Sequence, residues 1–419
     1  MVALPTSEGG DPSDLRIQNI STTGFEISQV EPQGRDGPHI PMTVSYIAAE
    51  AGDNRLPDGS RVIVGTINTS AIQASGSAGS YEPVVFTNAL NGTPAVVANI
   101  LTMNAESGNP PAGPAQPWLT TVIENVSSTG FDIAMERSQT TAGTPGTETI
   151  GYIAIEDGLS GAFLDTGGSS IDWSSTRSSA TIQGWSDGCH AVTYSAVGFA
   201  VPRVVATKNS RTDSDGGWVR SCTVGATSIE LRVDEDTAVD GERNHPAQVA
   251  GILAFDGSFH AEFVTDLSAE KTATLVEDPI NGTANPYSLP GSRVRYTISV
   301  SNDGNVGTDD GTIDITDTMP PQTSLVVSDI SGAGSGPVLF NDGVPLSGLT
   351  YSFGGLSDLS DSLAFSSDGG SSFNYVPIPA ADGTDPNITH IAVHPSGQLD
   401  GAETGPAPNF SISFDILLQ

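Results

Sequence analysis

The chain has 419 residues, with 49 Asp and Glu against 15 Lys and Arg, which gives a formal net charge of −34. A surface this acidic repels phosphate backbones and anionic lipid, so the composition excludes nucleic acid and acidic membranes as partners. No apolar run approaches the roughly 18 residues that a membrane-spanning helix needs, so no membrane span is expected. Apolar residues make up 37% of the chain and charged residues only 15%, which is enough for several hydrophobic cores.

The chain contains 48 Gly and 28 Pro, and its apolar and polar residues alternate in short runs separated by turn residues. Alternation with a period of two is typical of strands that are buried on one face. Antiparallel β-sandwiches arranged in tandem are therefore the expected fold class.

A segment near the start of the chain occurs again about one hundred residues later. Asn19-Ile-Ser-Thr-Thr-Gly-Phe-Glu-Ile27 matches Asn125-Val-Ser-Ser-Thr-Gly-Phe-Asp-Ile133, and at the same distance beyond them Tyr46-Ile-Ala-Ala-Glu50 matches Tyr152-Ile-Ala-Ile-Glu156. Matching segments in the same order and at the same spacing indicate a structural repeat.

A third, more divergent copy ends with Ile252-Leu-Ala-Phe-Asp256. The repeat predicts an incomplete half module at 1–56, starting near Leu15, and complete sandwiches at 57–157 and 158–266. Because half a sandwich exposes apolar faces and unpaired edges, other strands are expected to complete the first module. Its edge is expected near Phe25, Ile27, Val44 and Tyr46.

A different pattern begins after residue 266, and 267–419 is expected to form one further sandwich. Its last segment alternates cleanly and has one fully apolar face, made of Phe410, Ile412, Phe414, Ile416 and Leu418. Two interpretations remain open for this strand. It either closes its own domain or is donated to a neighbouring chain.

The repeated unit resembles the H-type lectin module, a six-stranded antiparallel sandwich. The resemblance depends on a Pro-x-Val-Val strand, as at Pro202, on the Thr-Gly-Phe segment, and on the closing Tyr-Ile-Ala-Ile segment. In that family a Trp-His pair, an Arg and an Asp hold the sugar. No Trp-His follows Phe25 or Phe131 here, and only Arg16 and Arg220 match the family Arg. The resemblance therefore implies the lectin-like, jelly-roll-like fold and not the sugar site.

Residues 271–327 resemble a conserved repeat domain of unknown function from large bacterial surface proteins. The matching segments are Lys271, Pro290-Gly-Ser-Arg-Val-Arg-Tyr-Thr-Ile-Ser-Val-Ser-Asn-Asp-Gly304 and Thr316-Asp-Thr-Met-Pro320. Members of that family are Ig-like sandwiches in adhesins and fibres. The resemblance implies a C-terminal Ig-like domain and an extracellular, bacterial cell-surface location, with an export signal that is not in this sequence.

Two further features concern covalent and metal chemistry. Cys189 and Cys222 lack the other ligands of a zinc site, so a disulfide in an oxidising compartment is expected. Tight Gly turns carry Asp213 and Asp215 in one place and Asp303 and Asp309 in another, which are candidate calcium ligands or simply solvated turns. No cofactor is required.

No catalytic motif occurs in the sequence, so the chain is not expected to be an enzyme. The favoured interpretation is a structural subunit of an extracellular, pilus-like filament. Its copies would form a helical homopolymer, joined head to tail by β-strand complementation between the edge near Phe25 and the strand at Phe410–Ile416. The alternatives are a surface adhesin that binds glycans and a passive stalk of a larger surface protein.

Overall fold

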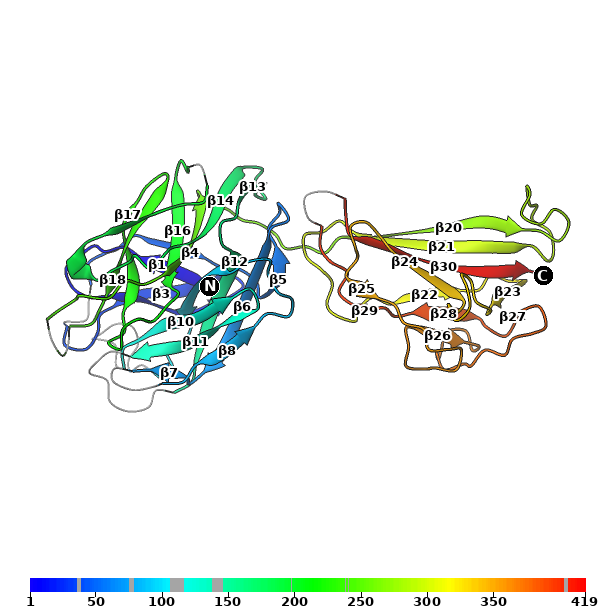
Figure 1. The fold of residues 1–419 in the computed structure, drawn as a ribbon, viewed down its shortest axis with the longest axis horizontal. Helices are drawn as coiled ribbons and strands as arrows, with labels where there is room; N and C mark the ends of the chain where they lie inside the picture. Colours follow the sequence, from blue (N-terminus) through cyan, green and yellow to red (C-terminus); the bar gives the residue numbers. More distant parts are fainter. Residues whose placement is uncertain are drawn as a thin grey trace. The chain divides into compact units, whose positions relative to one another are not determined.

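The computed structural model describes residues 1–35, 39–74, 79–105, 117–137, 146–196, 198–237, 239, 241–402 and 406–419. The chain divides into two compact units, Met1–Glu262 and Phe263–Gln419. In the described residues the regular elements are strands, apart from the short 3₁₀ helix η1 (Trp185–Asp187), which confirms the all-β fold class (Figure 1). No helix in this part of the chain has the length and apolar character needed to cross a bilayer.

The second module consists of β5 to β12 and forms two facing sheets. One sheet has the order β5-β6-β12-β9, and in the other β11 pairs with β10, β7 and β8. β5 belongs to this sheet and begins at Gly52, so the module starts before residue 57. The strands are β5 (Gly52–Arg55), β6 (Arg61–Thr69), β7 (Ile72–Gln73), β8 (Glu82–Val85), β9 (Pro94–Ile100), β10 (Leu119–Ser127), β11 (Gly130–Arg137) and β12 (Glu148–Glu156).

The third module repeats this arrangement with β13 to β19. Its sheets have the orders β13-β14-β19-β16 and β15-β18-β17. The strands are β13 (Ser160–Leu164), β14 (Ser170–Arg177), β15 (His190–Thr193), β16 (Pro202–Lys208), β17 (Trp218–Val224), β18 (Ser228–Asp234) and β19 (Ala250–Asp256).

Among the described residues of the first module, the strands are β1 (Val2–Pro5), β2 (Asp14–Ser21), β3 (Gly24–Val30) and β4 (Val44–Ile47), which pair as β1-β4 and β2-β3. By register, β1 corresponds to β9 and β16, because Ala3 faces Tyr46 as Ala98 faces Tyr152. The expectation that this module starts near Leu15 was therefore wrong. The short strand β1 lacks the Pro-x-Val-Val pattern, but Val2, Ala3 and Leu4 are buried like its counterparts.

The three modules meet through the equivalent strands β1, β9 and β16, which contact one another. Side chains of one strand bind the backbone of the next. Asn99 Oδ1 accepts from Ala3 N at 2.8 Å, and Thr207 Oγ1 accepts from Ala98 N at 3.0 Å. These cross-module bonds hold the three modules in one compact unit.

The second unit is a sandwich with its own hydrophobic core. One sheet has the order β20-β21-β30-β23-β27 with β24 also on β30, the second has the order β22-β28-β26, and β25 pairs with β29. The strands are β20 (Leu267–Glu277), β21 (Arg293–Asn302), β22 (Ile315–Thr318), β23 (Thr323–Val326), β24 (Val338–Asp342), β25 (Leu349–Thr350), β26 (Leu363–Ser366), β27 (Thr384–Asp385), β28 (His390–Val393), β29 (Ser396–Gly397) and β30 (Asn409–Leu418).

β30 lies in the interior of its sheet. It pairs with β21 along one side and with β24 and β23 along the other. Its apolar face is buried in the core, and Phe410, Ile412, Phe414 and Ile416 are all at most 1% exposed. Of the two interpretations of this strand, closure of its own domain describes the structure.

Candidate functional site: the open first module

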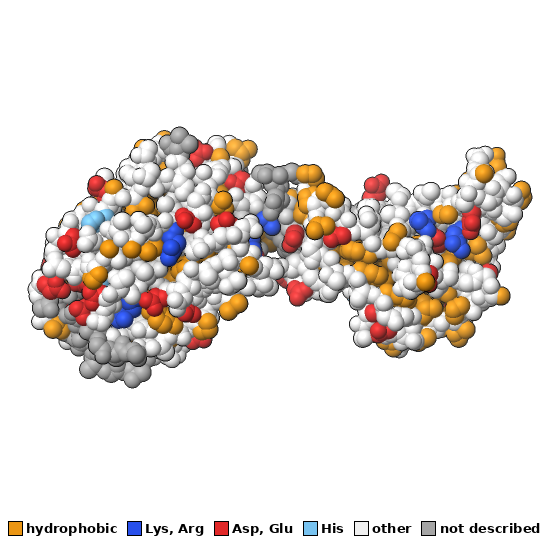
Figure 2. Space-filling model, viewed as in Figure 1, with side chains coloured by type: hydrophobic (Ala, Val, Ile, Leu, Met, Phe, Trp, Pro, Cys, Tyr) orange, Lys and Arg blue, Asp and Glu red, His pale blue; other side chains and the backbone are white. Residues whose placement is uncertain are grey.

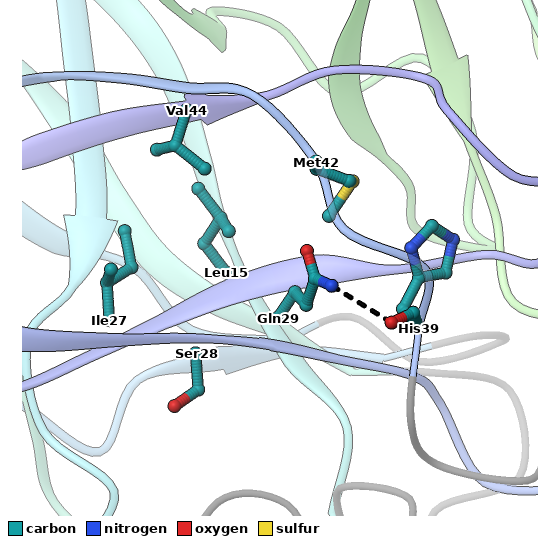
Figure 3. A pocket seen from close by; sticks show the side chains of 7 residues that line it. All are labelled: Leu15, Ile27, Ser28, Gln29, His39, Met42 and Val44. Carbon is teal, nitrogen blue, oxygen red and sulfur yellow. Dashed lines mark hydrogen bonds between the residues drawn. The ribbon is translucent and has the colours of Figure 1, made fainter.

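A groove of about 470 Å³ opens between the two small sheets of the first module (Figure 3). Its walls come from β2, β3 and β4 and from the segment that precedes β4. Ile27, Leu15 and Val44 form the apolar end, and Gln29 closes the other end by donating from Nε2 to His39 O at 3.0 Å. The lining residues are Leu15, Ile27, Ser28, Gln29, His39, Met42 and Val44.

An aromatic pair continues the apolar surface beyond the groove. The rings of Phe25 and Tyr46 meet edge to face with centroids 4.9 Å apart. Tyr46 is 55% exposed and Phe25 only partly buried. Phe25, Ile27, Val44 and Tyr46, which the sequence placed at an edge, thus lie together on one partly exposed surface.

The complete second module shows what covers this surface elsewhere. Phe131 and Tyr152 form the same pair with centroids 5.2 Å apart, but Phe131 is only 3% exposed. β6 pairs with the free side of β12 and places Gly65 opposite Tyr152, while β8 pairs with β11 and places Val84 opposite Phe131. Within the described residues, β4 pairs with β1 alone and β3 with β2 alone, so both equivalent edges are unpaired.

The glycine at position 65 makes room for the side chain of Tyr152, its partner on the next strand. A Cβ added to Gly65 would overlap the Tyr152 hydroxyl, so only glycine lets the phenol lie across the strand. In the third module the equivalent pair is Thr176 opposite Ile252, where the tyrosine and the glycine are both absent. The sequence alone did not reveal this match, because the pairing of β6 with β12 cannot be read from local pattern.

Buried acidic residues join the modules to one another. Asp234, at the end of β18, is fully buried and accepts from Arg220 Nη1 at 2.7 Å and from Arg243 Nε at 2.9 Å. Arg220 also donates to the carbonyl oxygens of Thr6, Glu8 and Asp11, at 2.9 to 3.0 Å. This guanidinium therefore ties the third module to the first.

Glu136 is the residue of the second module that corresponds to Asp234. Its carboxylate binds Lys208 Nζ at 2.6 Å and Arg211 Nε at 2.7 Å, and Lys208 and Glu136 are each 1% exposed. In the first module the same position is Val30, which packs instead against Trp118 and Trp218. The scarcity of lysine, with Lys208 one of only two in the chain, was the sequence signal that could have drawn attention to this pair.

Glu235 and His245 form a further buried pair, with Glu235 Oε1 2.5 Å from His245 Nδ1. Burial, reinforced by the nearby Glu242 and Asp213 carboxylates, raises the pKa of Glu235 to about 8. Burial, reinforced by Lys208, lowers the pKa of His245 to about 4. Both groups are therefore mostly uncharged near neutral pH, and both lie buried in the connection between β18 and β19.

The two arginines that match the lectin family are both buried. Arg16 is 2% exposed and its guanidinium lies 4.5 Å from the centre of the Trp118 ring, while Arg220 is fully engaged as described above. Neither guanidinium is placed to reach a bound sugar from solvent. Their structural role is the stacking and bonding that holds the modules together.

A disulfide joins Cys189 and Cys222 in the third module, with the Cα atoms 6.3 Å apart. Cys189 immediately precedes β15 and Cys222 lies in β17, the two strands on either side of β18. The bridge therefore spans this sheet.

The candidate calcium residues lie in turns of separate units. The backbone N–H of Asp215 donates to Asp213 Oδ1 at 3.2 Å. Asp303 and Asp309 are exposed and belong to the second unit. In the part of the chain that the structure describes, no three His, Cys, Asp or Glu side chains gather as a metal site would require. Calcium binding at these turns stays a prediction.

Comparison with known proteins gives one clear sequence match. Over 318 residues the chain is 30% identical to halomucin from Haloquadratum walsbyi, a match that covers 74% of this chain and 3% of halomucin. The chain thus spans a very small part of that relative. No family model matches.

Solved structures give only weak neighbours. A protein described as membrane-anchored from Corynebacterium diphtheriae aligns at 11% identity with a TM-score of 0.17, covering 100% of this chain and 88% of the other. A triple jelly-roll protein of an archaeal virus turret aligns at 10% identity with a TM-score of 0.10, covering 99% and 90%. Scores this low lend no support to a specific shared fold.

Proposed function

We propose that this chain is a structural subunit of an extracellular surface filament, joined to its neighbour by β-strand complementation at the first module, and that its role is not catalytic. The observation that carries the proposal is the pair of unpaired edges around the groove, since an exposed apolar edge is a template for added strands. The match to halomucin, a protein named as a mucin, supports a location outside the cell.

The acidic surface suits such a location. On the face drawn in Figure 2, Asp and Glu side chains are spread over both units, while Lys and Arg appear at few places. A net charge far from zero keeps a protein soluble at high concentration, and salt screens the repulsion that it causes.

The strand that completes the neighbour is not expected to be β30. Donating β30 would remove the strand that holds β21 on one side and β23 and β24 on the other. It would also expose the core side chains of the second unit. The receiving edge near Phe25 and Tyr46 keeps its place in the proposal.

Negative-stain electron microscopy with mass photometry tests this function. Fibres with an axial repeat of one subunit are expected once the first module is engaged, and they should be lost when Tyr46→Asp and Ile27→Asp place charge on the receiving edge. Fibres of normal length in this double variant would contradict the proposal. Monomers of about the 43.0 kDa chain mass together with binding on a glycan array would instead favour the adhesin.

A further inference from the structure

We propose that the open first module binds a polypeptide segment of its own repeat type, a β-hairpin followed by an edge strand, with a glycine opposite Tyr46 and a small β-branched residue opposite Phe25. The inference deepens the proposed function and rests on it for the choice of site. It names the chemistry of the partner, which the open edges alone do not.

The equivalence of the modules supplies the first step. Each complete module contains a first half, β5 to β8 or β13 to β15, and a second half, β9 to β12 or β16 to β19. The first module has only a second half, β1 to β4, and its groove lies at the position that the first halves cover elsewhere. An occupant of the same type would pair with both unpaired edges at once.

The register of the pairs supplies the second step. β6 places Gly65 opposite Tyr152. Tyr46 contacts the ring of Phe25 as Tyr152 contacts the ring of the equivalent Phe131. A side chain in the added strand at this position would meet the phenol, so the partner needs glycine there. On the other edge Val84 faces Phe131 and Val192 faces Ile229, and both valines are buried. The added strand is therefore expected to place a residue of the size of valine opposite Phe25.

The third step compares the number of first halves with the number of second halves among the three modules. The described residues contain three second halves and two first halves, and both first halves are already paired within their own modules. A second copy could lend a first half only by opening one of its own modules. Such an exchange would complete the first module of the neighbour and leave a different half module open in the donor copy.

A fusion to the full chain tests the fit. Residues 52–95 placed directly before Met1 restore the connectivity of the second module, because Met1 aligns with Val96 when Ala3 aligns with Ala98. The added segment should raise the thermal midpoint of the first unit and slow hydrogen exchange in residues 24–30 and 44–47 by at least tenfold. The second unit, as an internal reference, should not change.

Matched variants make the test specific. Gly65→Val in the added copy alone should abolish the gain, and Gly65→Thr there should regain it when combined with Tyr46→Ile, which recreates the Thr176–Ile252 pair. If the fusion misfolds, a labelled peptide of residues 52–86 added to the unmodified chain gives the same comparison by fluorescence anisotropy.

Three outcomes would overturn the inference. The first is equal exchange at 24–30 and 44–47 with and without the segment. The second is equal binding of the Gly65→Val and unmodified segments. The third is no regain when Gly65→Thr in the segment is combined with Tyr46→Ile, which would show that the side-chain pair at this position does not set the fit. Each leaves the filament question, which microscopy decides, unaffected.

Discussion

The first and second modules use the same strands and the same aromatic pair, yet one is closed and the other open. In the second, Phe131 is 3% exposed and its strand β11 pairs with β8. In the first, Phe25 is partly buried, Tyr46 is 55% exposed, and a groove replaces the missing strands. The comparison teaches that the packing contacts of β1 with β9 and β16 hold half a sandwich in place without completing it.

The contacts between modules give the largest expected effect. Asp234→Asn should destabilise the first unit by about 3–5 kcal/mol, because it leaves Arg220 and Arg243 buried beside a neutral amide. Val30→Ala, the matched change at the corresponding apolar position, should cost less, about 1–3 kcal/mol. Urea unfolding measures both, and a larger loss for Val30→Ala would show that apolar packing dominates these contacts.

The aromatic residues test the difference between open and closed modules directly. Phe131→Ala should lower the free energy of unfolding by about 3–5 kcal/mol, as for a large core residue. Phe25→Ala should cost about 1–2 kcal/mol, because part of this ring is already in water. Equal losses would mean that the first module is as well packed as the second.

A pH series isolates the Glu235–His245 pair of the third module. The raised pKa of Glu235 makes the folded state retain a proton that the unfolded state releases, so stability falls as pH rises from about 5 through 8. The lowered pKa of His245 acts at the other end, where stability falls as pH drops from 6.5 through about 4.

Glu235→Gln should therefore flatten the decline above pH 5. The difference in slope should be at most about 1.4 kcal/mol per pH unit, the limit for one proton. Chemical denaturation at several pH values measures it. Parallel curves for the variant and the unmodified chain would place the titrating group elsewhere.

How far the sequence predicted the structure depended on whether the information was local or long-range. Alternation and turn residues predicted the all-β fold class, and the repeated Phe25 and Tyr46 segments located the open edge. The strand β1 was missed because Val2–Pro5 is short and lacks the repeated motif. Its place is set by contacts with β9 and β16, which are distant in sequence.

The role of the C-terminal strand shows the same limit. Its alternation is equally compatible with donation and with closure, and only pairing on both sides of β30 distinguishes them. The buried acid Asp234 was also beyond prediction, since a carboxylate in an acidic chain is ordinarily on the surface.

Hydrogen exchange of the unmodified chain, measured on the monomer, tests the central claim most directly, because it compares equivalent edges within one molecule. We expect amides of β3 and β4 to exchange much faster than those of β11 and β12, since only the latter are covered on both sides. Equal protection of the two pairs of strands would contradict the claim that the first module is open.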